Sequence, residues 1–189
     1  MTNPWFFILA VLTVLATPGP TNTLLASGAA ISGVRASLPL LLAELGGYLI
    51  TVDLVGFLLR PVIAANPAIA IGLKIVVALY LAYMAVRLWR RTNDATMART
   101  AVTWRSVFVA TLLNPKGLIF ALVIVPFGSP DVFFYLLAFA AAVIAVGFLW
   151  LVTGNLLGAM AGEKRRLVPR IASVALVGFA GLIAASAFG

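Results

Sequence analysis

The chain has 189 residues, of which 63% are hydrophobic and 10% are charged. Soluble domains average about 45–50% apolar and about 25% charged residues, so this composition excludes a soluble protein and predicts a polytopic membrane protein. The net charge of +8 does not indicate a nucleic-acid partner, because the basic residues lie between apolar runs, where they set orientation. Cysteine and histidine are absent, which excludes disulfides, thiolate or imidazole metal sites and histidine acid–base chemistry, and we expect no metal or cofactor.

Six apolar stretches follow one another along the chain. Each is close to the length of about 20 residues that a helix needs to cross a bilayer, and a helix satisfies its own backbone hydrogen bonds there. The first stretch has no Lys or Arg before it, so we interpret it as a retained helix and not as a secretory signal. The predicted spans are 5–27, 37–59, 67–89, 105–126, 132–156 and 168–188.

The loops between these spans differ sharply in charge. Loops one, three and five together hold ten Lys and Arg residues, whereas loops two and four hold only Arg60. The positive-inside rule therefore places the odd-numbered loops in the cytoplasm and both termini outside it.

The long third loop divides the chain into two halves of three spans. We expect one transmembrane domain over 1–189, with repeat one at about 1–91, a cytoplasmic loop at about 91–104 and repeat two at about 105–189. An odd number of spans per half gives the halves opposite orientations, which is the condition for an inverted repeat. Shifting the sequence by 97 residues lays Pro18 on Pro115, in the first helix of each half.

Helix-breaking residues interrupt these two helices. The first contains TPGPTN at 17–22, and the fourth contains LLNPKG at 112–117. Proline removes a helical hydrogen bond, and the freed carbonyls are tolerated at membrane depth only inside protein or along a cavity. Matched interruptions of this kind indicate a transporter's substrate site, although a single proline kink can also serve packing alone. The candidate binding residues are Thr17, Pro18, Gly19, Pro20, Asn22, Asn114, Pro115 and Lys116.

Four charged residues fall inside predicted spans: Glu44, Asp53, Lys74 and Lys116. A central charge costs about 2.5–3.5 kcal/mol even on the lenient insertion scale, so these side chains should pair or face water. Similar depth in adjacent antiparallel spans predicts an Asp53–Lys74 ion pair, and Lys116 has the reach for Glu44 or Asp53. Structural pairs are one interpretation. The other is functional: Lys116 beside exposed helix N-termini favours a carboxylate ligand, and any proton coupling would use Glu44 or Asp53.

The stretches TPGPTNTLLASGAAISGVRAS, LKIVVALYLAYMAVRLWR and LLNPKGLIFAL resemble the LysE/RhtB amino-acid exporter family in order and spacing over nearly the whole chain. The resemblance implies a bacterial inner-membrane exporter of amino acids or related small metabolites. Two positions depart from the family pattern. The Gly-rich stretch of the third span is here Val76-Val77-Ala78, and the second span carries Glu44, which argues against assuming lysine or threonine as the substrate.

The sequence therefore predicts a six-helix secondary exporter with broken first and fourth helices, working by alternating access and coupled to protons. Its partners would be a small-molecule substrate and membrane lipid, and the small size of the chain is compatible with a homodimer. No Walker A, HExxH, GxSxG or GxGxxG pattern occurs, so we do not expect an enzyme. Two alternatives stay open: an exporter of ions or cationic drugs that uses Glu44, and a non-transporting membrane assembly factor or channel.

Overall fold

The computed structural model describes residues 3–59 and 102–160, together with isolated positions between 62 and 86 and between 174 and 185. Every element in the described part is a helix. In chain order they are α1 (Pro4–Ala16), α2 (Pro20–Ser32), α3 (Val34–Ser37), α4 (Pro39–Asp53), η1 (Leu54–Leu59), α7 (Trp104–Leu112), α8 (Pro115–Ile119), η3 (Phe120–Ile124) and α9 (Val132–Met160), where η1 and η3 are π-helical. The predicted third and sixth spans, and with them the six-span inverted repeat, lie largely outside the described residues.

The described helices carry the length and hydropathy of membrane spans. Val34–Leu58 and Val132–Ala159 are each long and apolar enough to cross a bilayer, and the number of spans in the described part rises from two to four if each bent helix pair is one span. The pairs are α1 with α2, bent by 61°, and α7 with α8–η3, bent by 43°. The prediction that the first and fourth helices are broken is therefore confirmed.

Prolines mark where these helices begin. Pro4, Pro20, Pro39 and Pro115 each occupy the first turn of a helix, where the missing N–H costs nothing and the fixed φ is already helical. Pro115 therefore corresponds in position to Pro20, and not to Pro18 as the shift of 97 residues predicted. Pro20 starts α2 and Pro115 starts α8, and these residues are 95 positions apart. The helix starts therefore correspond at an offset of 95 residues, whereas the sequence suggested 97.

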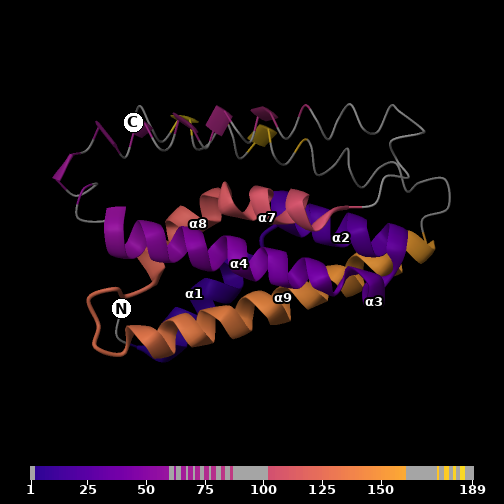
Figure 1. Ribbon diagram of the computed structural model, residues 1–189, viewed down its shortest axis with the longest axis horizontal. Coiled ribbons are helices and arrows are strands. Elements are labelled where there is room, and N and C mark those ends of the chain that lie inside the picture. Colours follow the sequence, from indigo (N-terminus) through magenta and orange to yellow (C-terminus); the bar gives the residue numbers. More distant parts are fainter. Residues whose placement is uncertain are drawn as a thin grey trace.

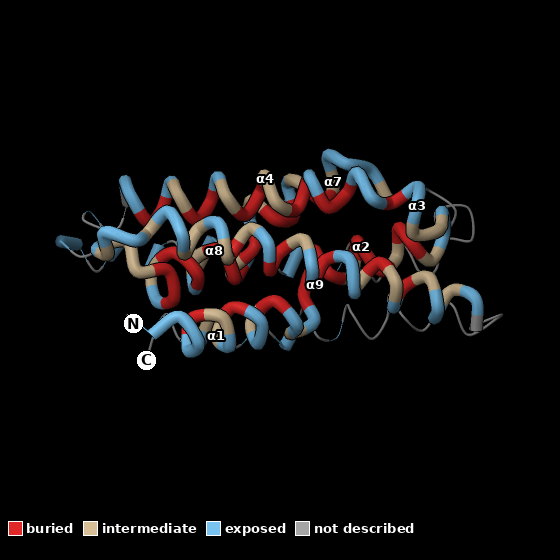
Figure 2. Tube along the Cα trace, turned by 90° about the horizontal axis from the view of Figure 1, so that it is seen from below, coloured by how far each residue is buried: buried red, intermediate tan, exposed pale blue. Residues whose placement is uncertain are grey.

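The helices lie side by side along the long axis, with α4 between α7–α8 and α9 (Figure 1). Their inner faces are buried and their outer faces exposed (Figure 2). The outer faces carry large apolar side chains, as a lipid-facing surface requires. Among those on α9 are Phe133, Phe134, Leu137, Leu149 and Leu156.

Small residues bring α2 and α9 into close contact. A Cβ added at Gly154 would overlap the backbone of Ala26, and one added at Gly158 would lie 2.8 Å from the carbonyl oxygen of Ala30. Gly154 and Gly158 form a GxxxG pair that packs on the Ala26 and Ala30 pair of α2. This is the close backbone approach by which membrane helices associate, since lipid provides no hydrophobic force between them.

Two apolar clusters fill the interior, one toward each end of the bundle. The first joins α1, the end of α4, η3 and the first half of α9, and the second joins α2, the start of α4, α7 and the later part of α9. The helix breaks fall where the first cluster gives way to the second. Buried polar residues gather at this boundary: Thr21, Asn22, Glu44, Thr51, Thr111, Asn114 and Lys116.

Candidate functional site

The first break frees several backbone carbonyls, among them those of Leu15 and Thr17. In a continuous helix, the carbonyls of Leu15 and Thr17 would accept from the N–H groups four residues later, at Gly19 and Thr21. Instead α1 ends at Ala16 and α2 starts at Pro20. The Asn22 side-chain amide takes the place of those donors, with Nδ2 lying 2.8 Å from the Leu15 oxygen and 2.9 Å from the Thr17 oxygen.

At the second break, two other side chains hydrogen-bond the backbone groups that lose their helical partners. Asn114 caps α8, and its Oδ1 accepts from the Lys116 backbone N–H at 3.1 Å. That N–H is consequently withdrawn from the carbonyl of Leu112, its helical acceptor. The Thr51 hydroxyl of α4 donates to the Leu112 oxygen at 2.8 Å and also lies 3.0 Å from the Gly47 oxygen.

Lys116 joins the two breaks. It is only 7% exposed, and its Nζ donates to the Leu15 oxygen at 3.3 Å and to the Thr17 oxygen. Gly19 makes room for this side chain, because a Cβ there would lie 3.2 Å from Cε and 3.4 Å from Nζ of Lys116. The Lys116 ammonium, which comes from the second half of the chain, therefore binds carbonyls that the first break removes from helical hydrogen bonding.

A chain of hydrogen bonds ties the breaks to α4 and α7. Asn114 Nδ2 donates to the Thr21 hydroxyl at 3.0 Å and to the Tyr48 hydroxyl at 3.1 Å. The Thr111 hydroxyl donates its single proton to the Val107 carbonyl at 2.8 Å. Thr21 must then be the donor in its 3.1 Å bond with Thr111, so the network fixes the direction of each bond.

Glu44 differs from its neighbours in being unsatisfied. The side chain is 1% exposed, and its Oε2 has no hydrogen-bond partner among the residues that the structure describes. Gly147 of α9 lies directly against it, since a Cβ there would collide with Oε2 and come within 2.8 Å of Leu41 Cδ2. The predicted reach of Lys116 to an acid is not realised as a direct contact: Glu44 and Lys116 interact electrostatically, while the Lys116 ammonium is bonded to carbonyls.

Asp53 lies apart from this cluster. It is the last residue of α4, it is partly buried, and its Oδ1 has no partner in the described part of the chain. Its predicted partner Lys74 lies outside the described residues, so the Asp53–Lys74 ion pair stays a prediction.

The chain matches the sequence model of the LysE type translocator family over residues 12–187. It belongs to this family. A stretch of 135 residues is also 30% identical to the uncharacterized membrane protein PA4757 of Pseudomonas aeruginosa, and the match spans 64% of this chain and 61% of that protein. No solved structure matches the chain. The family resemblance carried by TPGPTN and LLNPKG is thus confirmed.

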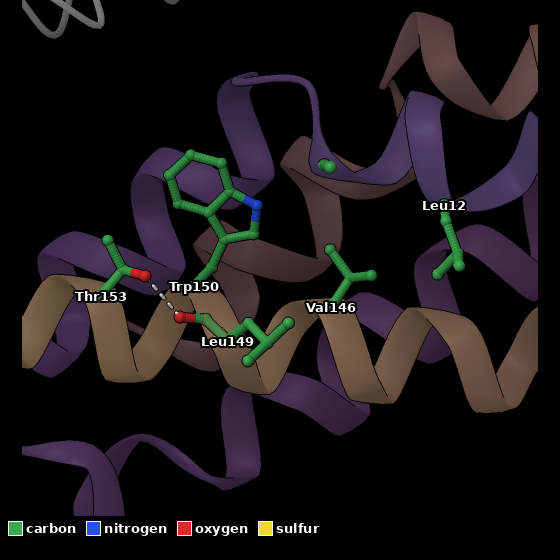
Figure 3. Close-up of a pocket in the computed structure, with 6 residues that line it drawn as sticks. Leu12, Val146, Leu149, Trp150 and Thr153 are labelled. Atoms are coloured by element: carbon green, nitrogen blue, oxygen red, sulfur yellow. Dashed lines mark hydrogen bonds between the residues drawn. The ribbon is translucent and has the colours of Figure 1, made fainter. Parts of the chain in front are cut away.

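The translocator also has an apolar pocket of about 350 Å³ between α1 and α9 (Figure 3). In the close-up, Leu12 of α1 lies across from Val146, Leu149 and Trp150 of α9. Leu149 is largely exposed on the outer surface, and the one hydroxyl at the pocket, Thr153, donates to the Leu149 carbonyl at 2.8 Å. The Thr153 hydroxyl is therefore bonded within its own helix, which leaves the Trp150 indole N–H as the other polar group on an otherwise apolar lining.

The structure brings together the candidate residues of both breaks and adds others that the sequence interpretation missed, among them Tyr48 and Thr51. These two follow the predicted residue Glu44 at i+4 and i+7, which places all three on one face of α4. That spacing was a usable signal, as was the position of Thr21 within TPGPTN. The roles of Thr111 and Gly147 had no such signal, because each depends on which helix packs opposite.

Gly147 gives a direct test of the Glu44 environment in this translocator. Gly147→Ala is expected to lower the free energy of unfolding by about 1–3 kcal/mol, because the new methyl group forces the Glu44 carboxylate and Leu41 out of their places. The measurement is thermal unfolding of the purified protein in detergent. Gly46→Ala is the matched control, since a Cβ there meets Phe108 only at 3.7 Å. Adding Glu44→Ala should recover part of the loss, and strictly additive effects would show that the two residues do not touch.

Proposed function

We propose that this LysE type translocator is a secondary-active exporter of amino acids or closely related small metabolites across the bacterial inner membrane. The proposal depends above all on one observation: the two helix breaks meet, and they bring the freed carbonyls of Leu15 and Thr17, an uncapped helix N-terminus and a buried cation to one place. Export, substrate class and location come from the family, whose members are membrane translocators.

The cluster offers complementary groups for both ends of an amino acid. The N-cap of α2 is Gly19, which has no capping side chain, so the first N–H groups of this helix are suited to a carboxylate. The carbonyls of Leu15 and Thr17 are suited to an ammonium group. Unwound carbonyls and half-helix N-termini bind substrates in this way in other broken-helix transporters.

Alternating access would come from opposite movements of the two halves around this cluster. Asn22, Asn114 and Lys116 are almost fully buried, so this conformation is closed around the breaks. In this proposal both termini lie outside the cytoplasm, which the charge difference between odd- and even-numbered loops supports. With histidine absent, Glu44 is the buried group best situated to carry a coupled proton.

Efflux from cells tests the proposal. Cells that express the protein and are loaded with each amino acid in turn should release at least one amino acid faster than cells with an empty vector. Lys116→Ala should abolish the difference, and a protonophore should abolish it in the wild type. Arg105→Ala is the matched control, because Arg105 is exposed near the start of α7. Failure of the wild type to release any amino acid would overturn the proposal.

Glu44 favours a second candidate function, the export of ions or cationic drugs, because an unpaired buried carboxylate is suited to a cation. The two functions differ in their ligands. Amino acids should raise the unfolding temperature of the purified protein if it is an amino-acid exporter, whereas cationic dyes should do so, in a manner lost in Glu44→Gln, if it exports cations.

A further inference from the structure

The Lys116 ammonium lies where a ligand cation would lie. Its Nζ is bonded to the carbonyls of Leu15 and Thr17, two of the acceptors that the first break takes away from helical N–H donors. Gly19 leaves space for the end of the side chain. The group that fills the position is a primary ammonium ion, which is the same chemical group that an amino acid would bring.

Glu44 provides a second place for that ammonium. Its Oε2 is buried without a partner, yet Glu44 and Lys116 attract each other through space. A buried charge or polar atom without a partner is costly, so the present arrangement leaves Glu44 with an interaction still to be made. Lysine has a flexible four-carbon stem, which allows its ammonium to move while the backbone stays in place.

We propose that the Lys116 ammonium is a resident competitor of the substrate's ammonium group, and that substrate binding transfers it from the Leu15 and Thr17 carbonyls to the Glu44 carboxylate. This inference rests on the proposed function and specifies how its binding site works. Before binding, the carbonyls hold Lys116 and Glu44 is unpaired. After binding, the carbonyls hold the substrate and Glu44 holds Lys116.

The exchange keeps a cation on the carbonyls of the first break in both states. The Asn22 amide donates to the Leu15 and Thr17 carbonyls, and each oxygen has a second lone pair that an ammonium can use. Lys116 occupies these positions first, and the incoming ammonium replaces one cation by another at the carbonyls. The exchange also gives selectivity, because a ligand whose amine is acylated carries no charge with which to displace Lys116.

Methylammonium and acetate, the smallest ligands that carry each charge alone, test the inference by calorimetric titration of the purified protein in detergent. Lys116→Met removes the competitor and keeps the length of the side chain, so methylammonium should bind at least tenfold more tightly than to the wild type. Acetate affinity should stay within about twofold. The opposite result, unchanged methylammonium affinity with weaker acetate binding, would make Lys116 a carboxylate-binding residue and overturn the inference.

Glu44→Gln provides a second arm that does not depend on the folding of the Lys116 variant. Without the acid, displaced Lys116 has no partner, so methylammonium should bind at least fivefold more weakly. In the Lys116→Met background, the same substitution should have little effect. Asp131→Asn, which alters an exposed carboxylate before α9, should leave the affinity unchanged. Equal affinities for wild type and Glu44→Gln would contradict the exchange. Amino-acid efflux by the wild type is measured separately, so failure of the proposed function is distinguishable from failure of the exchange.

Discussion

Replacing Asn22 with leucine is expected to abolish transport and to lower the free energy of unfolding by about 3 kcal/mol. The substitution removes the amide that donates to the carbonyls of Leu15 and Thr17, at 2.8 Å and 2.9 Å. Leucine has the same number of side-chain heavy atoms and the same branching as asparagine, so the loss comes mainly from buried carbonyls left with fewer donors, each worth about 1–3 kcal/mol. The Lys116 ammonium still donates to the same carbonyls. The expected loss of stability is therefore smaller than if both carbonyls had no donor at all.

Thermal unfolding in detergent and cellular efflux together check this expectation. Asn155→Leu is the matched control, because Asn155 is only partly buried on α9 and lies away from the breaks. Asn22→Leu should unfold at a lower temperature than the wild type and should show no efflux. Asn155→Leu should match the wild type in both measurements. If Asn22→Leu unfolded at the wild-type temperature, the carbonyls of the first break would have other donors and the description of the break would be wrong.

Among glycine-to-alanine substitutions in the described helices, Gly154→Ala is expected to lower the free energy of unfolding the most. A Cβ at this position would overlap backbone atoms of Ala26, so no rotation of a side chain can relieve the clash and α2 must move away from α9. Overpacking of this kind costs about 1–3 kcal/mol and sometimes more. At about 2–4 °C per kcal/mol for a chain of this size, the unfolding temperature should fall by roughly 5–10 °C.

The same alanine at Gly46 of α4 serves as the control, since it meets only ordinary contacts there. Both substitutions add the same methyl group inside a helix, so differences in helix propensity cancel. A second effect should follow in transport, because α2 carries Thr21 and Asn22 into the cluster. A Gly154→Ala protein that unfolded within a degree of Gly46→Ala would contradict the close approach of α2 and α9.

The helix breaks could be predicted from sequence because their cause is local. Pro18 and Pro20 lack an N–H wherever the chain goes, and Asn114 followed by Pro115 forms a helix start from neighbouring residues alone. The same local argument misjudged the correspondence between halves, since it aligned Pro115 with Pro18 and the helix starts align it with Pro20. Which of two nearby prolines begins a helix depends on the donors available to the freed carbonyls.

The partner of Lys116 could not be predicted in the same way. Depth along a helix suggested Glu44 or Asp53, whereas the ammonium is bonded to the backbone of Leu15 and Thr17, which lie 101 and 99 residues away in sequence. Depth fixes only one coordinate of a side chain. The other two depend on which helix faces which, and that is decided by contacts such as Gly154 against Ala26.

The sequence by itself determined that this protein is an all-helical membrane protein of the LysE type translocator family, with helix breaks within TPGPTN at 17–22 and LLNPKG at 112–117. Composition, hydropathy and proline chemistry act through neighbouring residues and the surrounding solvent. The fold class and the helix breaks can therefore be inferred from the linear sequence. Only the tertiary structure decided that the breaks meet, that Lys116 occupies the carbonyls of the opposite break, and that Glu44 is left unpaired against Gly147. Those facts follow from helix packing, where the absence of a side chain at a glycine allows two helix backbones to approach closely.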